Sequence, residues 1–285
     1  MDIKGRKNMP PRLSRIFYFL TLIGLLTSCV APSAAQPTPT AIAVPDGWEL
    51  LWHDEFDGDT IDATNWTYDL GGGGWGNGEM QVYTNTPENA RVESGLLVIE
   101  ARKEITENGG FKFTSARLKT QGLQTFQYGR IEARIKVPAG KGFWPAFWML
   151  GENFPVVGWP DCGEIDIMEY VGREPDLVIG TMHGPGYSGA MGLSKWKRLD
   201  YSVADDFHTY AVEWDSDQIS WYFDGENYST YTREDVGSRT WAFDQPFFII
   251  LNLAIGGTLG GLVTPDTQFP AQYLVDYVRV YRQIP

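Results

Sequence analysis

The sequence is poor in cysteine and histidine, and it has too few basic residues to balance its acids. Its 285 residues include 2 Cys and 3 His, so neither a disulfide framework nor a cysteine–histidine zinc site is expected. Lysine and arginine number 23 against 36 aspartates and glutamates, a formal net charge of −13. A protein that binds nucleic acid through its phosphates needs a basic surface. The composition therefore argues against a disulfide-rich scaffold, a zinc enzyme and a nucleic-acid partner.

No hydrophobic run near the N-terminus is long enough to cross a membrane. The apolar stretch at residues 16–26 covers 11 residues, whereas a spanning helix needs about 20. Basic residues precede it, as in an export signal, and it ends in Leu26-Thr27-Ser28-Cys29, which resembles a bacterial lipobox. We therefore expect residues 1–28 to be a lipoprotein-type signal peptide and Cys29 to carry a lipid that anchors the protein to the membrane of the cell envelope. The alternative is an ordinary signal peptide, an incidental Cys29 and a secreted protein.

Glycine and aromatic residues, in contrast, are abundant. After Cys29, residues up to 45 are uncharged and rich in Pro, Thr and Ala, which is typical of a flexible linker. Residues 46–285 contain no comparable linker and should form one domain. Apolar residues alternate strictly at 130–137, which predicts a strand. Similar short β-rich runs lie at 96–101, 177–182, 208–214, 219–223, 247–254 and 274–281. Asp224-Gly225 lies between two strand candidates and predicts a turn. Many short strands in one domain predict an all-β fold, either a sandwich or a jelly roll.

Three acids interrupt one of the most apolar segments of the chain. Glu164, Asp166 and Glu169 lie within six residues, although ionised side chains are costly in a strand unless they face water or partners. The two-residue period of a strand places Glu164 and Asp166 on one face but turns Glu169 away. A β-bulge around Ile167-Met168 would return Glu169 to that face. We therefore predict a bulged strand with three acids on one surface.

A row of carboxyl groups is what retaining glycoside hydrolysis requires. One carboxylate attacks the anomeric carbon, while another, kept protonated, donates to the leaving oxygen. The proximity of like charges raises the pKa of one carboxyl group, so that an acid can stay protonated near neutral pH. The alternatives for three spaced acids alone are an edge strand with solvated side chains and a calcium site.

The motif 164–169 resembles the signature of glycoside hydrolase family 16. Further blocks of the sequence resemble that family in the expected order: 52–56, 74–79, 142–148, 252–257 and 275–281. The resemblance implies a β-jelly-roll sandwich of two curved antiparallel sheets with a substrate cleft on the concave face. It assigns Glu164 as the nucleophile, Asp166 as its assistant and Glu169 as the acid/base.

The resemblance is strongest to the laminarinase branch, which cleaves β-1,3-glucan. Met168, before the last glutamate, is shared by laminarinases, agarases and carrageenases, and the block from Trp75 to Tyr83 favours the β-1,3-glucanase branch, whereas Gly78 replaces an Asn that is common there. The predicted function is retaining endo-hydrolysis of β-1,3-glucan by a monomer. Two alternatives stay open: a family enzyme acting on mixed-linkage glucan, agarose or carrageenan, and a non-catalytic β-glucan-binding protein.

Candidate substrate-binding residues combine flat aromatic faces with polar groups, because the former stack on sugar rings and the latter fix hydroxyls. Trp144 and Trp148 lie four residues apart and should share one face of a strand. The resemblance adds Arg117 and Asn77, which match family positions that contact substrate, so the full predicted set is Asn77, Arg117, Trp144, Trp148, Trp159 and His183. For each, a purely structural role is the alternative: core packing for the tryptophans, a turn for Asn77, an ion pair for Arg117 and a structural hydrogen bond for His183.

Catalysis of this kind needs no cofactor, but members of the family often carry a structural calcium ion. The resemblance places its ligands at Glu55, Gly95 and Asp276, with backbone carbonyls contributing, in accordance with the preference of calcium for oxygen. The alternative is that the acids close turns or pair with arginine.

Overall fold

The alternating segment at 130–137 forms strand β8 (Gly129–Lys136), in which the apolar side chains are buried and Glu132, Arg134 and Lys136 are partly exposed. The other β-rich runs of the sequence form strands as well. The predicted turn at Asp224-Gly225 joins two of them, and both residues have positive φ (48° and 79°), as a tight hairpin turn requires.

The structure is a computed structural model that describes residues 42–284, and the described residues from Ala43 onward form one unit. The predicted signal peptide and Cys29 lie outside the described residues, as does most of the predicted linker. Among the residues described, no helix is long and apolar enough to span a membrane.

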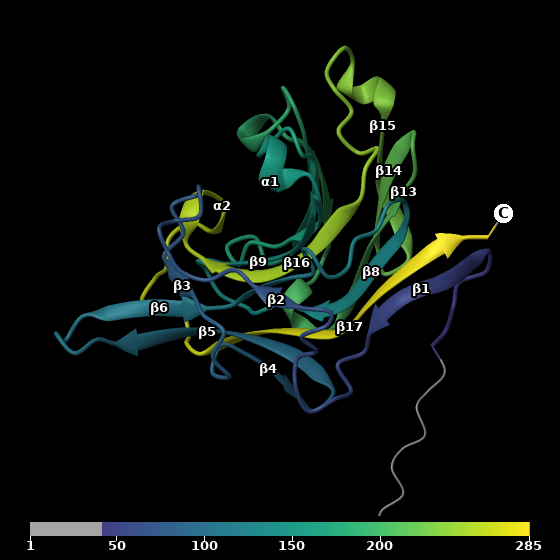
Figure 1. Cartoon of the computed structure of the whole chain (residues 1–285). Coiled ribbons are helices and arrows are strands. Elements are labelled where there is room, and N and C mark those ends of the chain that lie inside the picture. Colours follow the sequence, from purple (N-terminus) through teal and green to yellow (C-terminus); the bar gives the residue numbers. More distant parts are fainter. Residues whose placement is uncertain (1–41, 285) are drawn as a thin grey trace, which may run out of the picture. The chain divides into compact units, whose positions relative to one another are not determined.

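Two sheets stack face to face (Figure 1). The ten-stranded sheet follows the order β15 (Glu226–Thr232), β14 (Gln218–Phe223), β13 (His208–Trp214), β8, β17 (Ala271–Gln283), β5 (Leu96–Ile105), β6 (Phe111–Ser115), β3 (Gln81–Tyr83), with β1 (Trp48–Asp54) on β17 and β4 (Ala90–Glu93) on β5. The seven-stranded sheet follows the order β12 (Leu193–Arg198), β11 (Leu177–His183), β10 (Glu164–Glu169), β9 (Phe143–Gly151), β16 (Phe247–Ile255), β7 (Arg117–Lys119), β2 (Thr67–Tyr68). The pairings within the described residues are antiparallel, except that β3 runs parallel to β6.

Helical segments are short and lie in the connections. They are α1 (Phe154–Val157), α2 (Gly257–Gly260) and three 3₁₀ turns at Gly189–Met191, Val203–Asp205 and Arg233–Val236. The main hydrophobic core lies between the sheets, and β16 is buried along its whole length. The predicted all-β sandwich is confirmed.

The predicted bulge in β10 is also confirmed. Its register against β9 shifts between Asp166 and Met168, and its register against β11 shifts between Asp166 and Glu169. On β11, Thr181 pairs with Asp166 and Ile179 pairs with Glu169, so Gly180 alone opposes Ile167 and Met168. Two residues against one is the defining geometry of a bulge.

Trp221 of the opposite sheet stabilises the bulge from the core side. Its indole Nε1 donates a buried hydrogen bond of 2.8 Å to the backbone carbonyl of Asp166, at the point where the register shifts. Gly180 leaves the room for this ring, because a Cβ at that position would lie 2.7 Å from Trp221 Nε1 and 2.6 Å from Tyr228 Oη.

Gly180→Ala should therefore destabilise the fold by roughly 1–3 kcal/mol, which is typical of overpacking in a core. Urea unfolding followed by circular dichroism measures this change. Gly58→Ala is the matched control, since a Cβ there would approach no atom closer than 3.8 Å. Equal stability of the two variants would contradict the proposed packing of Trp221 against Gly180.

Candidate active site

The bulge brings three acids to one side of β10. Ile165, Ile167 and Met168 all belong to the main core between the sheets, so the intervening side chains of Glu164, Asp166 and Glu169 point the other way. We call this side of the seven-stranded sheet the carboxylate face. A smaller apolar cluster of Leu150, Cys162, Phe248 and Ile250, with Trp148 packed against it, lies outside the main core.

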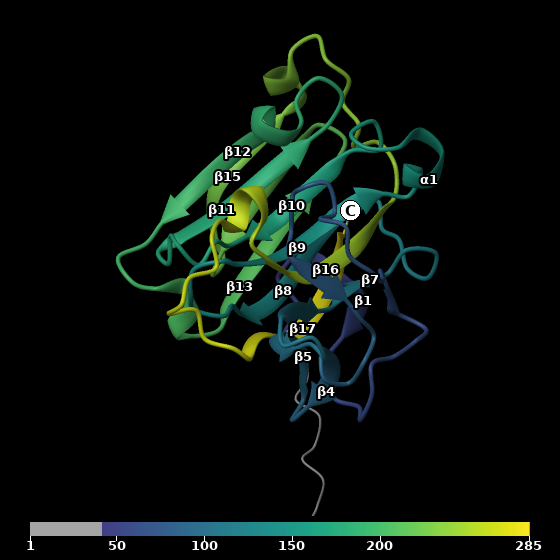
Figure 2. The same ribbon diagram turned by 90° about the vertical axis from the view of Figure 1, so that its left-hand side faces the viewer.

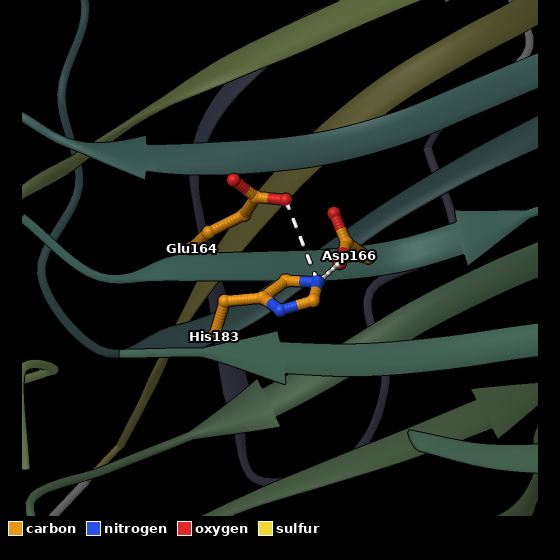
Figure 3. Close-up of side chains that lie close together, drawn as sticks. All are labelled: Glu164, Asp166 and His183. Atoms are coloured by element: carbon orange, nitrogen blue, oxygen red, sulfur yellow. Dashed lines mark ion pairs between the residues drawn. The ribbon is translucent and has the colours of Figure 1, made fainter. Parts of the chain in front are cut away.

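His183 joins two of the three acids. It lies on β11 opposite Glu164, and its Nε2 is 3.2 Å from Asp166 Oδ2 and 3.7 Å from Glu164 Oε1 (Figure 3). Gly192 gives the imidazole its space, since a Cβ there would lie 2.5 Å from His183 Nδ1. The structure thus places His183, predicted as a substrate-binding residue, in contact with two of the acids.

The chemistry of this trio also bears on metal binding. One ligand atom from each of Glu164, Asp166 and His183 lies within 4.8 Å of the others, which is the spacing of a potential metal site. However, His183 Nε2 itself lies between the two carboxyl groups, at ion-pair distance from both, so the three side chains already contact one another without an ion.

Glu169 is held by two other side chains. Trp144 Nε1 donates to Glu169 Oε1 at 3.0 Å, and the hydroxyl of Thr181 lies 3.5 Å from Glu169 Oε2. Trp159, in the loop after α1, donates a hydrogen bond to Glu164, and its ring centre lies 6.1 Å from that of His183. Two of the three predicted tryptophans, Trp144 and Trp159, therefore contact the acid cluster. Thr181 is a further contact that the sequence did not reveal.

Burial dominates the electrostatics of the cluster. It raises the pKa of Glu164 to about 8, with the charge of Asp166 acting in the same direction. It raises the pKa of Glu169 to about 7, with the charge of Glu164 adding to the effect. Burial and the charge of Glu169 raise the pKa of Asp166 well above its ordinary range. The charge of His183 opposes these shifts at both glutamates, but burial outweighs it, so their pKa values still lie near neutral pH.

A chain of polar contacts continues the carboxylate face toward β7. Trp148 Nε1 donates to Asn252 Oδ1 at 2.7 Å, Asn252 Nδ2 donates to Tyr83 Oη at 3.1 Å, and Tyr83 donates to Glu79 at 3.2 Å. Asn77 ends this chain with a hydrogen bond of 3.2 Å to Glu79 Oε1. Sequence reasoning gave Asn252 no role, although it is the polar residue in the otherwise apolar strand β16.

The predicted positions Asn77 and Arg117 flank this chain. The Arg117 guanidinium lies over the ring of Trp148 at 4.7 Å and over that of Trp75 at 5.0 Å, within the range of cation–π contact. Its Nε also pairs with Asp69 Oδ2 at 2.9 Å, which is the ion pair of the structural interpretation, and the role of Arg117 in substrate binding stays a prediction. Asn77 helps to line a hollow of about 400 Å³ whose other walls are Gly78, Met80, Gly257, Thr258, Gly261 and Leu262.

The residues predicted to bind calcium lie on or next to strands of the ten-stranded sheet, whereas the acid cluster lies on the seven-stranded sheet. Both oxygens of the Glu55 carboxylate accept hydrogen bonds from Arg279, at 2.9 and 2.7 Å, and Asp276 pairs with Arg134 at 2.7 Å. Gly95 lies in the turn between β4 and β5. As they stand, these carboxylates do not fit a calcium ion, because the ion would have to displace Arg279 from Glu55. The calcium site stays a prediction.

An antiparallel β-sandwich with a bulged strand of three acids is the architecture of a carbohydrate-cleaving enzyme. The model of the family described as glycosyl hydrolases family 16 matches residues 77–279, which is more than half of the chain. The chain therefore belongs to glycosyl hydrolases family 16. The resemblance inferred from the motifs, the jelly-roll class of the fold and the class of enzyme, a glycoside hydrolase, are confirmed.

Individual relatives agree with this assignment. The chain is 47% identical over 248 residues to a "Beta-glucanase" of Rhodothermus marinus, covering 83% of this chain and 86% of the relative. It is 37% identical over 277 residues to "Glucan endo-1,3-beta-glucosidase A1" of Niallia circulans, covering 88% of this chain but only 40% of that protein. The crystal structure of an endo-β-1,3-glucanase from Pyrococcus furiosus is similar with 48% identity and a TM-score of 0.79, covering 83% and 95% of the two chains.

The raised pKa of Glu164 has a consequence for stability. An acid with a raised pKa in the folded protein keeps a proton that the unfolded chain has released, so its contribution to stability is lost as the pH rises from about 4.5 to about 8. Glu164→Gln removes this loss. We expect the variant to exceed the wild type in the free energy of unfolding by roughly 1–3 kcal/mol more at pH 8 than at pH 4.5.

Urea unfolding at both pH values measures the difference. Glu107→Gln, in the exposed turn between β5 and β6, is the matched control and should shift stability equally at the two pH values. If Glu164→Gln gave the same difference at pH 4.5 as at pH 8, the folded protein would not be holding the proton.

Proposed function

We propose that the protein hydrolyses β-1,3-glucan at internal bonds with retention of the anomeric configuration. One observation carries the proposal: the bulge in β10 places Glu164 and Glu169 on the same buried face, with His183 at the first and Trp144 at the second. Retaining hydrolysis needs two such carboxyl groups close together, one ionised and one protonated.

The mechanism has two steps. In the first, the Glu164 carboxylate attacks the anomeric carbon, the glycosidic bond breaks, and the leaving oxygen takes the proton of Glu169. In the second, water attacks the same carbon and gives a proton to Glu169, and the ester bond to Glu164 breaks. Two inversions retain the configuration, and both carboxyl groups return to their starting protonation states.

The reaction needs the two glutamates in different protonation states, Glu164 ionised and Glu169 protonated. Their pKa values of about 8 and about 7 do not set this order in the free protein, because burial favours a proton on both. The charge of His183 and the hydrogen bond from Trp159 act toward ionisation of Glu164, the proposed nucleophile, and once Glu164 is ionised its charge favours the protonated form of Glu169, the proposed acid. Asp166 is buried and lies between the two glutamates on the strand. Its carboxyl group contacts the imidazole of His183 and so assists Glu164 by holding that imidazole next to it.

The names of the relatives support a β-glucan as the substrate. The endo-β-1,3-glucanase of Pyrococcus furiosus shares 48% of the aligned residues with this chain. Charge also favours a neutral polymer, because the face carries three carboxyl groups and the chain has a net charge of −13. A sulfated galactan such as carrageenan would meet repulsion there. Retention of both glutamates disfavours a non-catalytic glucan-binding protein.

The proposal extends to the location of the protein. Export, with a lipid on Cys29 as the anchor, is supported by the basic and apolar segments that precede this residue. Palmitate labelling of the wild-type chain and of Cys29→Ala would separate an anchored protein from a secreted one.

The activity is tested by incubating the full chain with laminarin, curdlan, lichenan, agarose and carrageenan and measuring released reducing ends. Cleavage of the two β-1,3-glucans is expected, and Glu164→Ala should lower it by roughly three orders of magnitude or more. Added azide should restore part of the turnover as a glycosyl azide of inverted configuration, since it occupies the space of the lost carboxylate. Cleavage confined to a galactan would refute the substrate, and wild-type activity of Glu164→Ala would refute the nucleophile.

His183→Gln should shift the acidic limb of the kcat/KM profile to higher pH. The positive charge that lowers the pKa of Glu164 is lost, so the carboxylate form of the nucleophile appears only at higher pH. Rates on laminarin across pH 4 to 9 measure the limb. His53→Gln, which alters an imidazole on β1 paired with Glu55, is the matched control and should leave the limb in place. An unchanged limb for His183→Gln would show that this imidazole does not act on Glu164.

A further inference from the structure

The edge strand β12 carries an aromatic residue with no assigned role. Trp196 is 69% exposed, and it is the most exposed of the tryptophans, followed by Trp159 at 46%. Within residues 42–284, its indole has neither a ring-stacking partner nor a hydrogen bond. Figure 2 shows β12 at one edge of the seven-stranded sheet, beyond β11 and β10.

Contacts along β12 establish which way Trp196 points. The hydroxyl of Ser194 lies 3.0 Å from that of Thr181, which in turn reaches Glu169, so Ser194 is on the carboxylate face. Side chains two residues apart on a strand share a face, which places Trp196 there as well. The lysines on either side point to the other sheet: Lys195 lies over the ring of Tyr231, and Lys197 pairs with Glu226.

The strand registers place Trp196 in one row with the proposed acid/base. Trp196 pairs with Ile179, and Ile179 pairs with Glu169. The same row continues from Glu169 through Ala146 and Asn252 to Arg117. It therefore crosses the whole sheet at right angles to the strands, with Arg117 toward one end and Trp196 at the other.

The distance suits a polymer. Strands in a sheet lie about 4.8 Å apart, so Trp196 lies roughly 10 Å from Glu169, about the length of two linked sugars. A glucan chain that follows the row past Glu169 reaches the indole, whose flat apolar face complements a pyranose ring. An exposed tryptophan otherwise costs solvation free energy, which such stacking recovers.

We propose that Trp196 is a stacking platform for a distal sugar of the β-glucan chain, on the β11–β12 side of the bond that is cleaved. This inference rests on the proposed function. It makes Trp196 a residue that determines preference for long chains and leaves the chemical step to the acids of β10.

The test compares wild type, Trp196→Ala and Trp196→Phe on laminarin and on the β-1,3-linked trisaccharide of glucose. For Trp196→Ala we expect KM for laminarin to rise about five- to twentyfold with kcat nearly unchanged, which corresponds to the loss of one stacked ring. The trisaccharide reaches Trp196 only in the binding mode that places two of its sugars on the β11–β12 side of the cleaved bond, so its kcat/KM should fall by only about twofold. Trp196→Phe should recover part of the affinity. Phe111→Ala is the matched control, because Phe111 is an exposed aromatic residue on β6. It should leave KM and kcat unchanged for both substrates.

Binding gives a second readout that does not depend on turnover. In the Glu164→Ala background, Trp196→Ala should raise the dissociation constant for laminarin by the same factor as it raises KM. If the wild type cleaves laminarin and Trp196→Ala keeps its KM and affinity, the platform is refuted while the proposed function stands. Equal losses on the trisaccharide and the polymer would also refute it, because a distal sugar would not be involved. If the wild type neither cleaves nor binds laminarin, the proposed function itself fails.

Discussion

The hydrogen bond from Trp221 to the backbone carbonyl of Asp166 is the contact on which the acid cluster depends. Without the extra residue in β10, Glu169 would point between the sheets, where an unpaired ionised carboxylate costs several kcal/mol. The bulge interrupts the ladder next to this carbonyl, and a lost hydrogen bond of that kind is worth about 1 kcal/mol. Trp221 offsets even this cost by donating to the carbonyl from the opposite sheet. The bulged register is therefore favoured by a wide margin, and Gly180 is the position that gives the indole its space.

The same geometry makes it costly in free energy to ionise all three acids of the carboxylate face at once. Burial and mutual repulsion raise the pKa of three carboxyl groups on one short strand, so the folded protein binds protons that its unfolded chain would release. Such a cluster lowers stability at neutral pH, and the large apolar core between the sheets compensates for it. The proposed mechanism uses one of these protons on Glu169 and needs Glu164 to lose its own. Proton-sharing within one cluster is how a pair of chemically identical side chains takes two different roles.

Sequence periodicity was sufficient for the features that depend on neighbours along the chain. The strands, the turn at Asp224 and the bulge at Ile167-Met168 follow from alternation and from the cost of turning an acid into a core. Contacts across the sheets were beyond its reach. Asn252 meets Tyr83 from 169 positions away, and the parallel pairing of β3 with β6 has no local signature. The proximity of His183 to Glu164 required the β10–β11 register, which alternation could not supply.

The row of paired residues across the sheet explains how one scaffold separates chemistry from specificity. The acids all come from β10, and their immediate partners come from β9 and β11, so the reacting centre occupies the middle of the sheet. Arg117 on β7 and Trp196 on β12 lie outward of this centre and touch none of the three acids. Under the proposal, substitution of Trp196 should therefore change contacts with a distal sugar without removing any contact of the three acids. The edge strand β12 pairs on one side only, so it tolerates a large exposed ring that an inner strand would have to bury.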